Sequence, residues 1–477
     1  MPEDIIRQSD DFPGWYNSVV QKAELADYSD VKGCMVIRPY GYALWENLQR
    51  DMDRRIKETG HQNVYFPMLI PERFLHKEAE HVEGFAPECA VVTHAGGAKL
   101  EEPLVVRPTS ETIINVTFAK WIQSYRDLPM LINQWANIVR WEMRPRLFLR
   151  TTEFLWQEGH TAHETKDEAV EETLRMLEVY RTFAEEMLAV PVVTGRKSDS
   201  ERFAGAVDTY CIEALCRDGK ALQAGTSHFL GQNFARAFNV QFQSREGKLE
   251  YAWQTSWGVS SRLIGCLVMV HGDDHGLILP PKVAPFQVVI VPIGRSAEQQ
   301  ETVAAEVAKI REEFGADVRL KVDDRDQYTP GWKFNEWELR GVPVRMEIGP
   351  RDVAKNQVVL VRRDTGEKEF VGRDGLKRAV LDRLDAVQQA LLDRALRFRE
   401  ENTHDAETYE QMKAVLAGET PGFVRASWCG DAACEEKVKT DTKATIRTIP
   451  FDQPAEFGRC IVCEKPGQYQ VLFAKAY

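Results

Sequence analysis

The 477-residue chain lacks any apolar run long enough to cross a lipid bilayer. Its longest such run, near residues 286–293, falls far short of the roughly 20 apolar residues that a membrane helix needs. The first residues, Met-Pro-Glu-Asp-Ile-Ile-Arg-Gln-Ser-Asp-Asp, are acidic and polar, unlike a secretory signal peptide. We therefore expect a cytoplasmic protein with no membrane association.

Positive charge is also in short supply. Lys and Arg number 61 against 73 Asp and Glu, which gives a formal net charge of −12 at pH 7. This balance argues against a protein that coats nucleic acid indiscriminately, although it leaves room for a local basic face. The composition is otherwise that of a globular protein long enough for two or three domains.

The cysteines give no sign of a disulfide framework. There are nine, an odd count, and such usage is typical of a reducing cytoplasm. Five occur singly in apolar surroundings: Cys34, Cys89, Cys211, Cys216 and Cys266.

The other four cysteines form two close pairs in the tail. Cys429-x4-Cys434 and Cys460-x2-Cys463 could each hold a metal ion from a turn, and four thiolates suit tetrahedral zinc. Because four protein ligands leave no open position, the expected role is structural. A disulfide pair or an iron–sulfur cluster is the alternative. The cytoplasmic context weighs against the first, and the spacing differs from the usual ferredoxin runs.

The segment from Arg140 to His163 is rich in charge. Apolar and polar residues alternate on both sides of Pro145, which predicts two strands joined by a loop. Arg140 and Glu142 should leave one face of the same strand, within reach of Arg150 on the return strand. Guanidiniums suit phosphate oxygens, and a carboxylate can accept from an amino group. A salt-bridged edge hairpin explains the spacing equally well.

Two other segments favour a nucleotide site. A strand is predicted to end at Arg107-Pro108, after which Thr109-Ser-Glu111 opens a helix. Glu111 could meet an ammonium group, although Thr and Glu are also favoured in a first helical turn. Arg262 lies in a stretch predicted to be buried, and a buried arginine needs an anion or several acceptors. Arg262 is therefore the second phosphate candidate.

Other patterns are less specific. A helix over residues 42–57, followed by a proline-bearing strand over 63–71, fits a dimer seam or a plain core helix beside an edge strand. A lone histidine such as His228 is more often an interior residue than a ligand or base. His271-Gly-Asp-Asp-His275 resembles a metal cluster, but its glycines favour a turn.

The pattern changes after Pro280-Pro281. Strand–helix alternation there predicts a small parallel-sheet α/β domain, separate from an antiparallel body. A helix over 374–401 then leads to the tail. The expected strands are 286–293, 317–322, 342–348 and 357–362, and the expected helices are 297–314 and 332–339.

Taken together, these residues resemble the class II aminoacyl-tRNA synthetases, and among them the prolyl-tRNA synthetases. The helix with its proline-bearing strand, the Arg-x-Glu hairpin and the arginine after Trp257-Gly look like the three class II motifs. In the third motif, Val259-Ser260-Ser261 replaces the usual glycine-rich run. The resemblance runs from about Phe12 to Tyr477. The stretches similar to prolyl enzymes are Arg107-Pro-Thr-Ser-Glu111, Arg140-Trp-Glu142, Phe148-Leu-Arg-Thr151, Phe154-Leu-Trp-Gln-Glu-Gly-His160, Gln223-Ala-Gly-Thr-Ser-His228 and His271-Gly-Asp-Asp.

The resemblance implies an α+β fold of the archaeal/eukaryotic-like type, without an editing insertion, and a homodimer. Its implied parts are a class II catalytic domain with an antiparallel sheet flanked by helices (1–283), an α/β anticodon-binding domain (284–375), a linking helix (376–402) and a small α+β zinc-binding C-terminal domain (403–477).

It also implies ligation of proline to tRNA(Pro) in two steps, ATP-dependent activation to prolyl-adenylate and transfer to the tRNA 3′ end. ATP is the substrate, and Mg2+ and structural Zn2+ are the implied metals. Arg140 and Arg262 would be catalytic. Proline would be bound by Thr109, Glu111, Arg140, Trp156, Glu158, Phe203 and His228. ATP would be bound by Arg140, Glu142, Arg150, Thr151, Phe154, Gln223, Thr226, Ser260 and Arg262.

For the tRNA, the resemblance places Glu338, Arg345 and Arg351 near guanines of the anticodon, since arginine suits guanine. A mixed solvated face is the alternative. Because an apolar pocket discriminates small groups only about 10- to 200-fold, misactivation of alanine or cysteine is a further hypothesis.

Two other functions compete with this one. A non-catalytic paralogue would lose the phosphate arginines, yet Arg140 and Arg262 are both present. A threonyl enzyme would need active-site zinc, whereas the four paired cysteines all lie in the tail.

Overall fold

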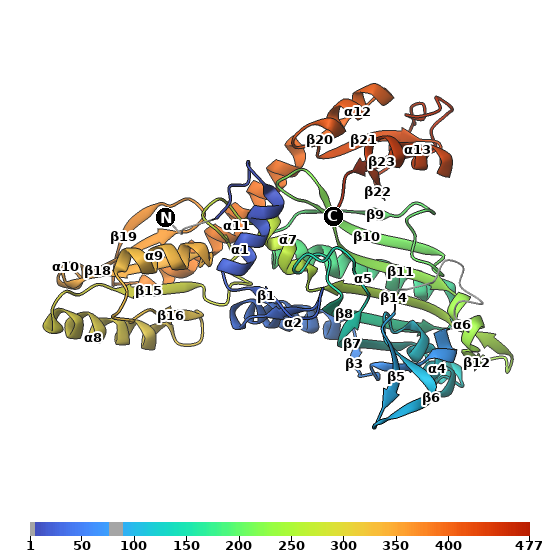
Figure 1. The fold of residues 1–477 in the computed structure, drawn as a ribbon, viewed down its shortest axis with the longest axis horizontal. Helices are drawn as coiled ribbons and strands as arrows, with labels where there is room; N and C mark the ends of the chain where they lie inside the picture. Colours follow the sequence, from blue (N-terminus) through green and yellow to red (C-terminus); the bar gives the residue numbers. More distant parts are fainter. Residues whose placement is uncertain (1–4, 76–88) are drawn as a thin grey trace.

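The computed structural model describes residues 5–75 and 89–477. An 11-stranded sheet runs through the body of the molecule, with the α/β part at the left of Figure 1 and the C-terminal residues at the upper right. Its strand pairs are antiparallel apart from β3 with β7 and β20 with β21. In sheet order the strands are β20 (Thr403–Asp405), β21 (Phe423–Trp428), β23 (Tyr469–Ala474), β22 (Thr445–Pro450), β9 (Val192–Arg196), β10 (Asp208–Leu215), β11 (Ala221–Gly231), β14 (Trp253–Ser260), β8 (Glu153–His163), β7 (Met130–Val139) and β3 (Gln62–Asn63).

Helix α5 (Lys166–Glu186) packs against β10, β11 and β14. It begins with a capping box, in which Thr165 and Glu168 exchange side-chain to backbone hydrogen bonds. Its Tyr180 is fully buried beside Trp257 of β14, so the helix and the sheet share the main hydrophobic core. Other helices in the described part of this body include α1 (Phe12–Lys22), α2 (Pro39–Glu58), α4 (Glu111–Trp121), α6 (Asn233–Phe238), α7 (Arg262–His271) and the 3-10 helix η1 (Tyr125–Asp127).

Three small sheets also belong to the described part of the body. They join β1 (Ala26–Tyr28) to β2 (Met35–Ile37), β12 (Gln241–Gln243) to β13 (Leu249–Tyr251), and β6 (Ala98–Val106) to both β4 (Leu69–Pro71) and β5 (Val91–Ala95). Within residues 5–75 and 89–477, no helix combines the length and the apolar character needed to span a membrane.

The charged hairpin differs from its prediction. Strand β7 ends at Val139 and strand β8 begins at Glu153, so Arg140, Glu142 and Arg150 lie in the connection and not on the strands. The physical reason is that Leu147, Phe148 and Leu149 are buried consecutively, at 1–3% exposure, which an alternating strand cannot achieve. The single strand predicted over 63–71 is also different in the structure. Only its two ends form strands, the short β3 and β4, and the residues between them do not.

The α/β domain has a mixed sheet where a parallel one was predicted. In the order β16-β15-β17-β18-β19, strand β15 pairs in parallel with both β16 and β17. The pairs β17–β18 and β18–β19 are antiparallel. The connections into β18 and β19 are too short for a parallel crossover, which needs a dozen or more residues. The elements are β15 (Val288–Pro292), α8 (Ala297–Phe314), β16 (Leu320–Val322), α9 (Pro330–Leu339), β17 (Val344–Ile348), α10 (Pro350–Ala354), β18 (Gln357–Arg362) and β19 (Lys368–Gly372).

The C-terminal part follows the long helix α11 (Leu376–Glu401) and includes α12 (Tyr409–Ala417) and α13 (Ala432–Thr442). Its strand β22 extends the central sheet by pairing with β9, Ile449 opposite Arg196 and Pro450 opposite Gly195. Gly195 permits this approach, because a Cβ there would lie 2.3 Å from the carbonyl oxygen of Ile449. The two parts therefore share one continuous sheet.

Replacing Gly195 by alanine is expected to loosen this junction. The added methyl group must push β22 away, so we expect the free energy of unfolding to fall by about 1–3 kcal/mol, the usual cost of overpacking. Chemical denaturation and limited proteolysis of the C-terminal part would measure the change. Gly331→Ala is the matched control, since nothing lies within 4 Å of its added Cβ. Equal stability of the two variants would contradict the argument.

Candidate active site

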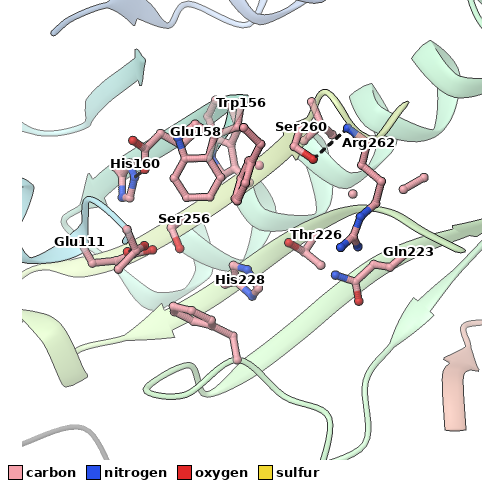
Figure 2. A pocket seen from close by; sticks show the side chains of 18 of the residues that line it. Glu111, Trp156, Glu158, His160, Gln223, Thr226, His228, Ser256, Ser260 and Arg262 are labelled. Carbon is pink, nitrogen blue, oxygen red and sulfur yellow. Dashed lines mark hydrogen bonds and ion pairs between the residues drawn. The ribbon is translucent and has the colours of Figure 1, made fainter. Parts of the chain in front are cut away.

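Two adjoining cavities open on the central sheet. The inner cavity has a volume of about 230 Å³ and the outer cavity about 310 Å³. Arg140, Phe154, Ser260 and Arg262 line both, so the two form one continuous depression. Figure 2 shows Glu111 at one end of the inner cavity and Arg262 at the other, with Trp156 and His228 between them.

The structure brings the predicted site residues onto these two cavities. The inner cavity holds the residues predicted around proline and most of those around ATP: Thr109, Glu111, Arg140, Phe154, Trp156, Glu158, Phe203, Gln223, Thr226, His228, Ser260 and Arg262. The outer cavity adds Glu142, Arg150 and Thr151.

Strand alternation places most of these side chains. Every second residue of a strand points to the same face, so Phe154, Trp156 and Glu158 of β8 line the cavity together. Neighbouring strands β11 and β14 contribute in the same way. Glu111 is the first residue of α4 and is only 4% exposed, and its carboxylate accepts a hydrogen bond from Thr109.

The two arginines are anchored alike. Arg140 donates from Nε to the carbonyl of Pro108 at 2.8 Å, and Arg262 donates from Nε to the carbonyl of Leu149 at 3.1 Å. Such a bond fixes one edge of the planar group and does not use Nη1 or Nη2, which can then bind an anion. Desolvation lowers the pKa of both, with Glu111 and Glu158 opposing it at Arg140 and Glu213 at Arg262.

Glu158 is a buried acceptor in the cavity wall. Its carboxylate accepts hydrogen bonds from Ser110, from Gln134 at 2.7 Å and from His160 at 2.9 Å. Burial acts to raise its pKa, but these donors, led by His160, hold it below the usual value. The group is therefore an anion whose lone pairs are already in use.

His228 is a neutral wall residue. Burial lowers its pKa to about 3, helped by the nearby His160 and Arg140. Its Nδ1 is 3.0 Å from the hydroxyl of Thr209, and its ring lies 4.6 Å from that of Phe203. This matches the interior histidine considered from the sequence, although the ring does face the inner cavity.

In the outer cavity Glu142 and Arg150 bind each other. Arg150 donates to the Glu142 carboxylate from Nη2 at 2.9 Å and from Nε at 3.0 Å, and the backbone N–H of Arg144 donates at 2.8 Å. The backbone bond from Arg144, with that ion pair, lowers the pKa of Glu142. A nucleotide that used both side chains would have to exchange this ion pair for its own contacts.

Several lining residues were missed from the sequence. His160 continues the alternation of β8, and Ser256 and Gly258 alternate with Ser260 on β14, so strand periodicity could have found these three. Trp257 is out of phase with them and packs against Tyr180, so alternation gives no signal for it. For the last residue, Tyr477, the sequence left open whether it enters the site. It lines the outer cavity, where its hydroxyl donates to Asp218 and its ring lies 5.5 Å from the guanidinium of Arg146.

Of the three residues predicted to lie near the anticodon, two line one cavity in the structure and the third does not. Glu338 and Arg345 line a cavity of about 170 Å³ in the α/β domain, together with Arg362, Arg363 and Lys368. Arg345 is paired with Glu347 at 2.9 Å. Arg351, at the start of α10, is not among the residues that line this cavity.

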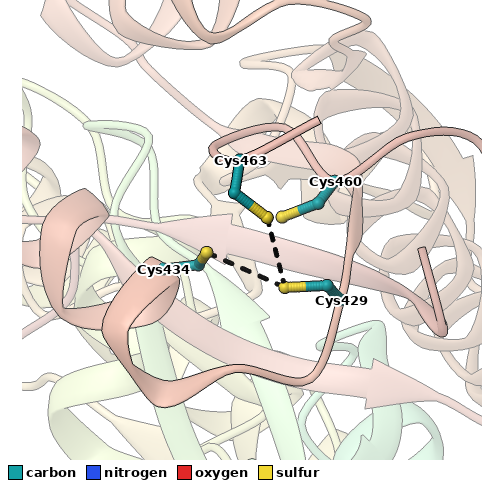
Figure 3. A group of neighbouring side chains, drawn as sticks. All are labelled: Cys429, Cys434, Cys460 and Cys463. Carbon is teal, nitrogen blue, oxygen red and sulfur yellow. Dashed lines mark hydrogen bonds between the residues drawn. The ribbon is translucent and has the colours of Figure 1, made fainter. Parts of the chain in front are cut away.

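The four tail cysteines converge on one point (Figure 3). Cys429 Sγ lies 3.7 Å from that of Cys434 and 3.6 Å from that of Cys463, and all four sulfur atoms lie within 4.8 Å of one another. A tetrahedral site with Zn–S distances of about 2.3 Å requires sulfur separations of about 3.8 Å. Disulfide bonds require about 2.05 Å. The geometry therefore fits a zinc ion and not a disulfide pair.

Backbone donors favour the thiolate form at one of these ligands. Burial acts to raise the pKa of Cys460, but the N–H groups of Cys463, Val462 and Cys429 bring it down to about 7. Thiolate sulfur is the form that binds zinc.

Comparison with known proteins covers the three parts of the chain. Residues 95–271 match the tRNA synthetase class II core domain (G, H, P, S and T), residues 287–383 the anticodon binding domain, and residues 409–477 the C-terminal domain of prolyl-tRNA synthetase.

Whole-length relatives and a solved structure agree with these matches. Proline–tRNA ligase of Chlorobium luteolum is 58% identical over the full length of both chains. Proline–tRNA ligase 2 of Clostridioides difficile is 56% identical, with 100% of this chain and 98% of that one covered. The crystal structure of prolyl-tRNA synthetase from Cryptosporidium parvum, complexed with halofuginone and AMPPNP, superposes with a TM-score of 0.94 at 44% identity and 99% coverage of each chain. The chain therefore belongs to the class II prolyl-tRNA synthetase family.

Proposed function

We propose that this protein attaches proline to tRNA(Pro) in two steps. Proline and ATP first give prolyl-adenylate and pyrophosphate, and the terminal ribose hydroxyl of the tRNA then takes the prolyl group. The observation that carries this proposal is the inner cavity, on which the carboxylate of Glu111 and two anchored guanidiniums, Arg140 and Arg262, meet. That set complements an amino acid beside a polyphosphate. Such chemistry depends on positioning and charge stabilisation.

In this proposal proline lies at the Glu111 end of the inner cavity. Glu111 and Thr109 take the two N–H bonds of its secondary ammonium, and Arg140 bridges its carboxylate and the α-phosphate of ATP. The ring is enclosed by the apolar and neutral groups of the wall: Trp156, Phe203 and His228, with Glu158 behind them. The neutrality of His228 supports this placement, because a cation there would repel the ammonium.

ATP then extends from Arg140 into the outer cavity. Phe154 stacks on the adenine base, Glu142 accepts from its amino group, and Thr151 lies beside it. Arg150 and Arg262 hold the outer phosphates, which give both guanidiniums an anionic partner. Gln223, Thr226 and Ser260 offer oxygen atoms of the kind Mg2+ prefers, and Mg2+ bound with ATP would offset phosphate charge.

Amino-acid-dependent pyrophosphate exchange tests this function. Among the twenty amino acids, proline is expected to support the strongest ATP–pyrophosphate exchange. The small pocket should also admit alanine and cysteine at a rate about 10- to 200-fold lower, because size is its main basis for choice. Arg262→Gln should abolish exchange with every amino acid. Exchange that is stronger with another amino acid would refute the assignment, and no exchange at millimolar cysteine would remove the misactivation hypothesis.

We further propose that Glu338, Arg345 and Arg351 contact the anticodon. The cavity lined by Glu338 and Arg345 supports this, because arginine binds guanine through two parallel hydrogen bonds. Arg345→Gln is expected to raise the KM for tRNA about 5- to 150-fold, the loss of one such contact. Arg351→Gln, outside the cavity, should have the smaller effect. Aminoacylation titrated with tRNA measures both, and the reverse order would contradict the placement.

A structural zinc ion at Cys429, Cys434, Cys460 and Cys463 is the third part of the proposal. Metal analysis of the purified chain is expected to give one zinc per chain. Cys434→Ser should lose the ion and lower the melting temperature, because zinc binding contributes directly to folding. Cys34→Ser, outside the cluster, is the control. A zinc-free wild-type chain with an unchanged melting temperature in chelator would contradict this assignment.

We also propose that the chain forms a homodimer in a reducing cytoplasm. Large apolar side chains are exposed around the β4-β6-β5 sheet and α4, which supports an interface there: Tyr65, Met68, Leu69, Val91 and Trp121. The buried thiols of Cys211, Cys216 and Cys266 are free, which supports the reducing compartment. Light scattering that gave only the mass of one chain, 54.5 kDa, would contradict the dimer.

A further inference from the structure

A buried charge cluster joins the C-terminal part to the catalytic sheet. Glu213 of β10 is fully buried and accepts from Arg447 of β22, with Nη2 at 2.9 Å and Nε at 3.2 Å. Lys197, just after β9, donates to the same carboxylate at 2.8 Å and to the backbone carbonyl of Arg447 at 2.7 Å. The three side chains come from three neighbouring strands or their ends, and all are less than 10% exposed.

This cluster lies next to the Arg262 end of the inner cavity, which is called the nucleotide end below because the proposed function places ATP there. Across the β10–β11 pair Glu213 is opposite Gln223, and directly opposed residues share one face of a sheet. Gln223 lines the inner cavity beside Arg262, as Figure 2 shows. A single row of side chains therefore leads from β22 through Glu213 and Gln223 to Arg262.

Positive charges outnumber negative ones among Glu213, Arg447, Lys197 and Arg262. One carboxylate, Glu213, serves two cations in direct contact, and Arg262 lies close enough for the charge of Glu213 to act on it. If Arg447 did not hold the carboxylate, Glu213 would be free to draw the Arg262 guanidinium towards itself. Arg447 repels Arg262 from the Glu213 side and so favours the cavity, whereas Arg140 and Arg150 repel it from the cavity side.

We propose that Glu213 and Arg447 are positioning residues for Arg262, so that the C-terminal part helps to set the affinity of the nucleotide end for ATP. This inference rests on the proposed function for its substrate, but the coupling between Arg447 and Arg262 does not depend on which amino acid is activated. Glu213 and Arg447 act through Arg262, whose guanidinium meets the phosphates.

A purely structural clamp would behave differently. If the ion pair only fastened β22 to β9, its loss would lower stability and would affect proline and ATP alike. A positioning role instead predicts a selective change in the KM for ATP, because proline lies at the opposite end of the inner cavity. The two roles are therefore separated by comparing the KM values of the two substrates.

The test uses the full-length chain with Arg447→Met, Arg447→Lys and Arg425→Met. In proline-dependent pyrophosphate exchange, Arg447→Met is expected to raise the KM for ATP about tenfold, a size typical of coupling between neighbouring buried groups, and the KM for proline less than twofold. Arg447→Lys keeps the charge and should recover most of the loss. Arg425→Met removes an exposed ion pair with Asp405 in the same part of the chain and should leave both KM values unchanged.

A double variant guards against simple misfolding. Arg447→Met with Glu213→Gln removes one charge of each sign, so it keeps the net charge of the wild-type cluster. It should bind ATP more tightly than Arg447→Met alone, which a destabilised fold could not explain. Circular dichroism would check that each variant is folded.

Binding of AMPPNP to the same variants, measured by calorimetry, separates this proposal from the proposed function. A wild-type chain without proline-dependent exchange would refute the function, yet a weaker AMPPNP affinity in Arg447→Met, restored in the double variant, would still support the coupling. An Arg447→Met chain whose KM for ATP and AMPPNP affinity stay within twofold of wild type would overturn the proposal. A parallel rise of both KM values, or the same loss in Arg425→Met, would also overturn it.

Discussion

The repulsion between two guanidiniums on one cavity is the constraint on which the site depends. Desolvation and neighbouring cations lower the pKa of Arg262, and Arg140 is one of those cations. Both groups stay in place because their Nε atoms bind carbonyl oxygens of Pro108 and Leu149, which belong to connections and not to regular strands. At the Arg262 end, the carboxylate that opposes this repulsion, Glu213, is already bound to Lys197 and Arg447, so the site can accept a further counter-charge. A polyphosphate supplies one, so the same positions that destabilise the empty cavity favour nucleotide binding.

The sheet beneath the cavity supplies the rigidity that this arrangement needs. Strands β8, β11 and β14 are hydrogen-bonded side by side, and their alternating residues form the floor. Packing there leaves no spare room: a Cβ on Gly159 would lie 2.0 Å from the ring of Trp257, which also contacts Tyr180 of α5. The positions of the side chains that line the cavity are thus set by the main core. The carboxylate end is further fixed by Glu158, which holds Ser110 and Gln134 together.

The C-terminal part contributes to the same site from outside. Through β22 it extends the sheet, through Arg447 it neutralises Glu213, and through Tyr477 it lines the outer cavity. The backbone of the last residues also bonds to Ala221 at the start of β11, the strand that carries Gln223 and His228. The zinc-type cysteine cluster therefore belongs to a unit that touches the nucleotide end. Its folding and the geometry of the cavity are physically linked.

Local patterns in the sequence determined what depends on neighbouring residues. Helix α8 was predicted with its observed ends, α4 begins at Glu111 as expected, and the spacing of the two cysteine pairs pointed to one tetrahedral cluster. The residue types of the Arg-x-Glu segment fitted a nucleotide site and a salt-bridged hairpin equally well, and Glu111 and Arg262 in other segments favoured the nucleotide site. Tertiary structure alone decided that Leu147, Phe148 and Leu149 of this segment are buried in a loop, and that Arg447 and Tyr477 reach the central sheet. The contacts of Arg447 and Tyr477 join residues far apart in the chain, and no local periodicity encodes which distant strand edges or charges will meet.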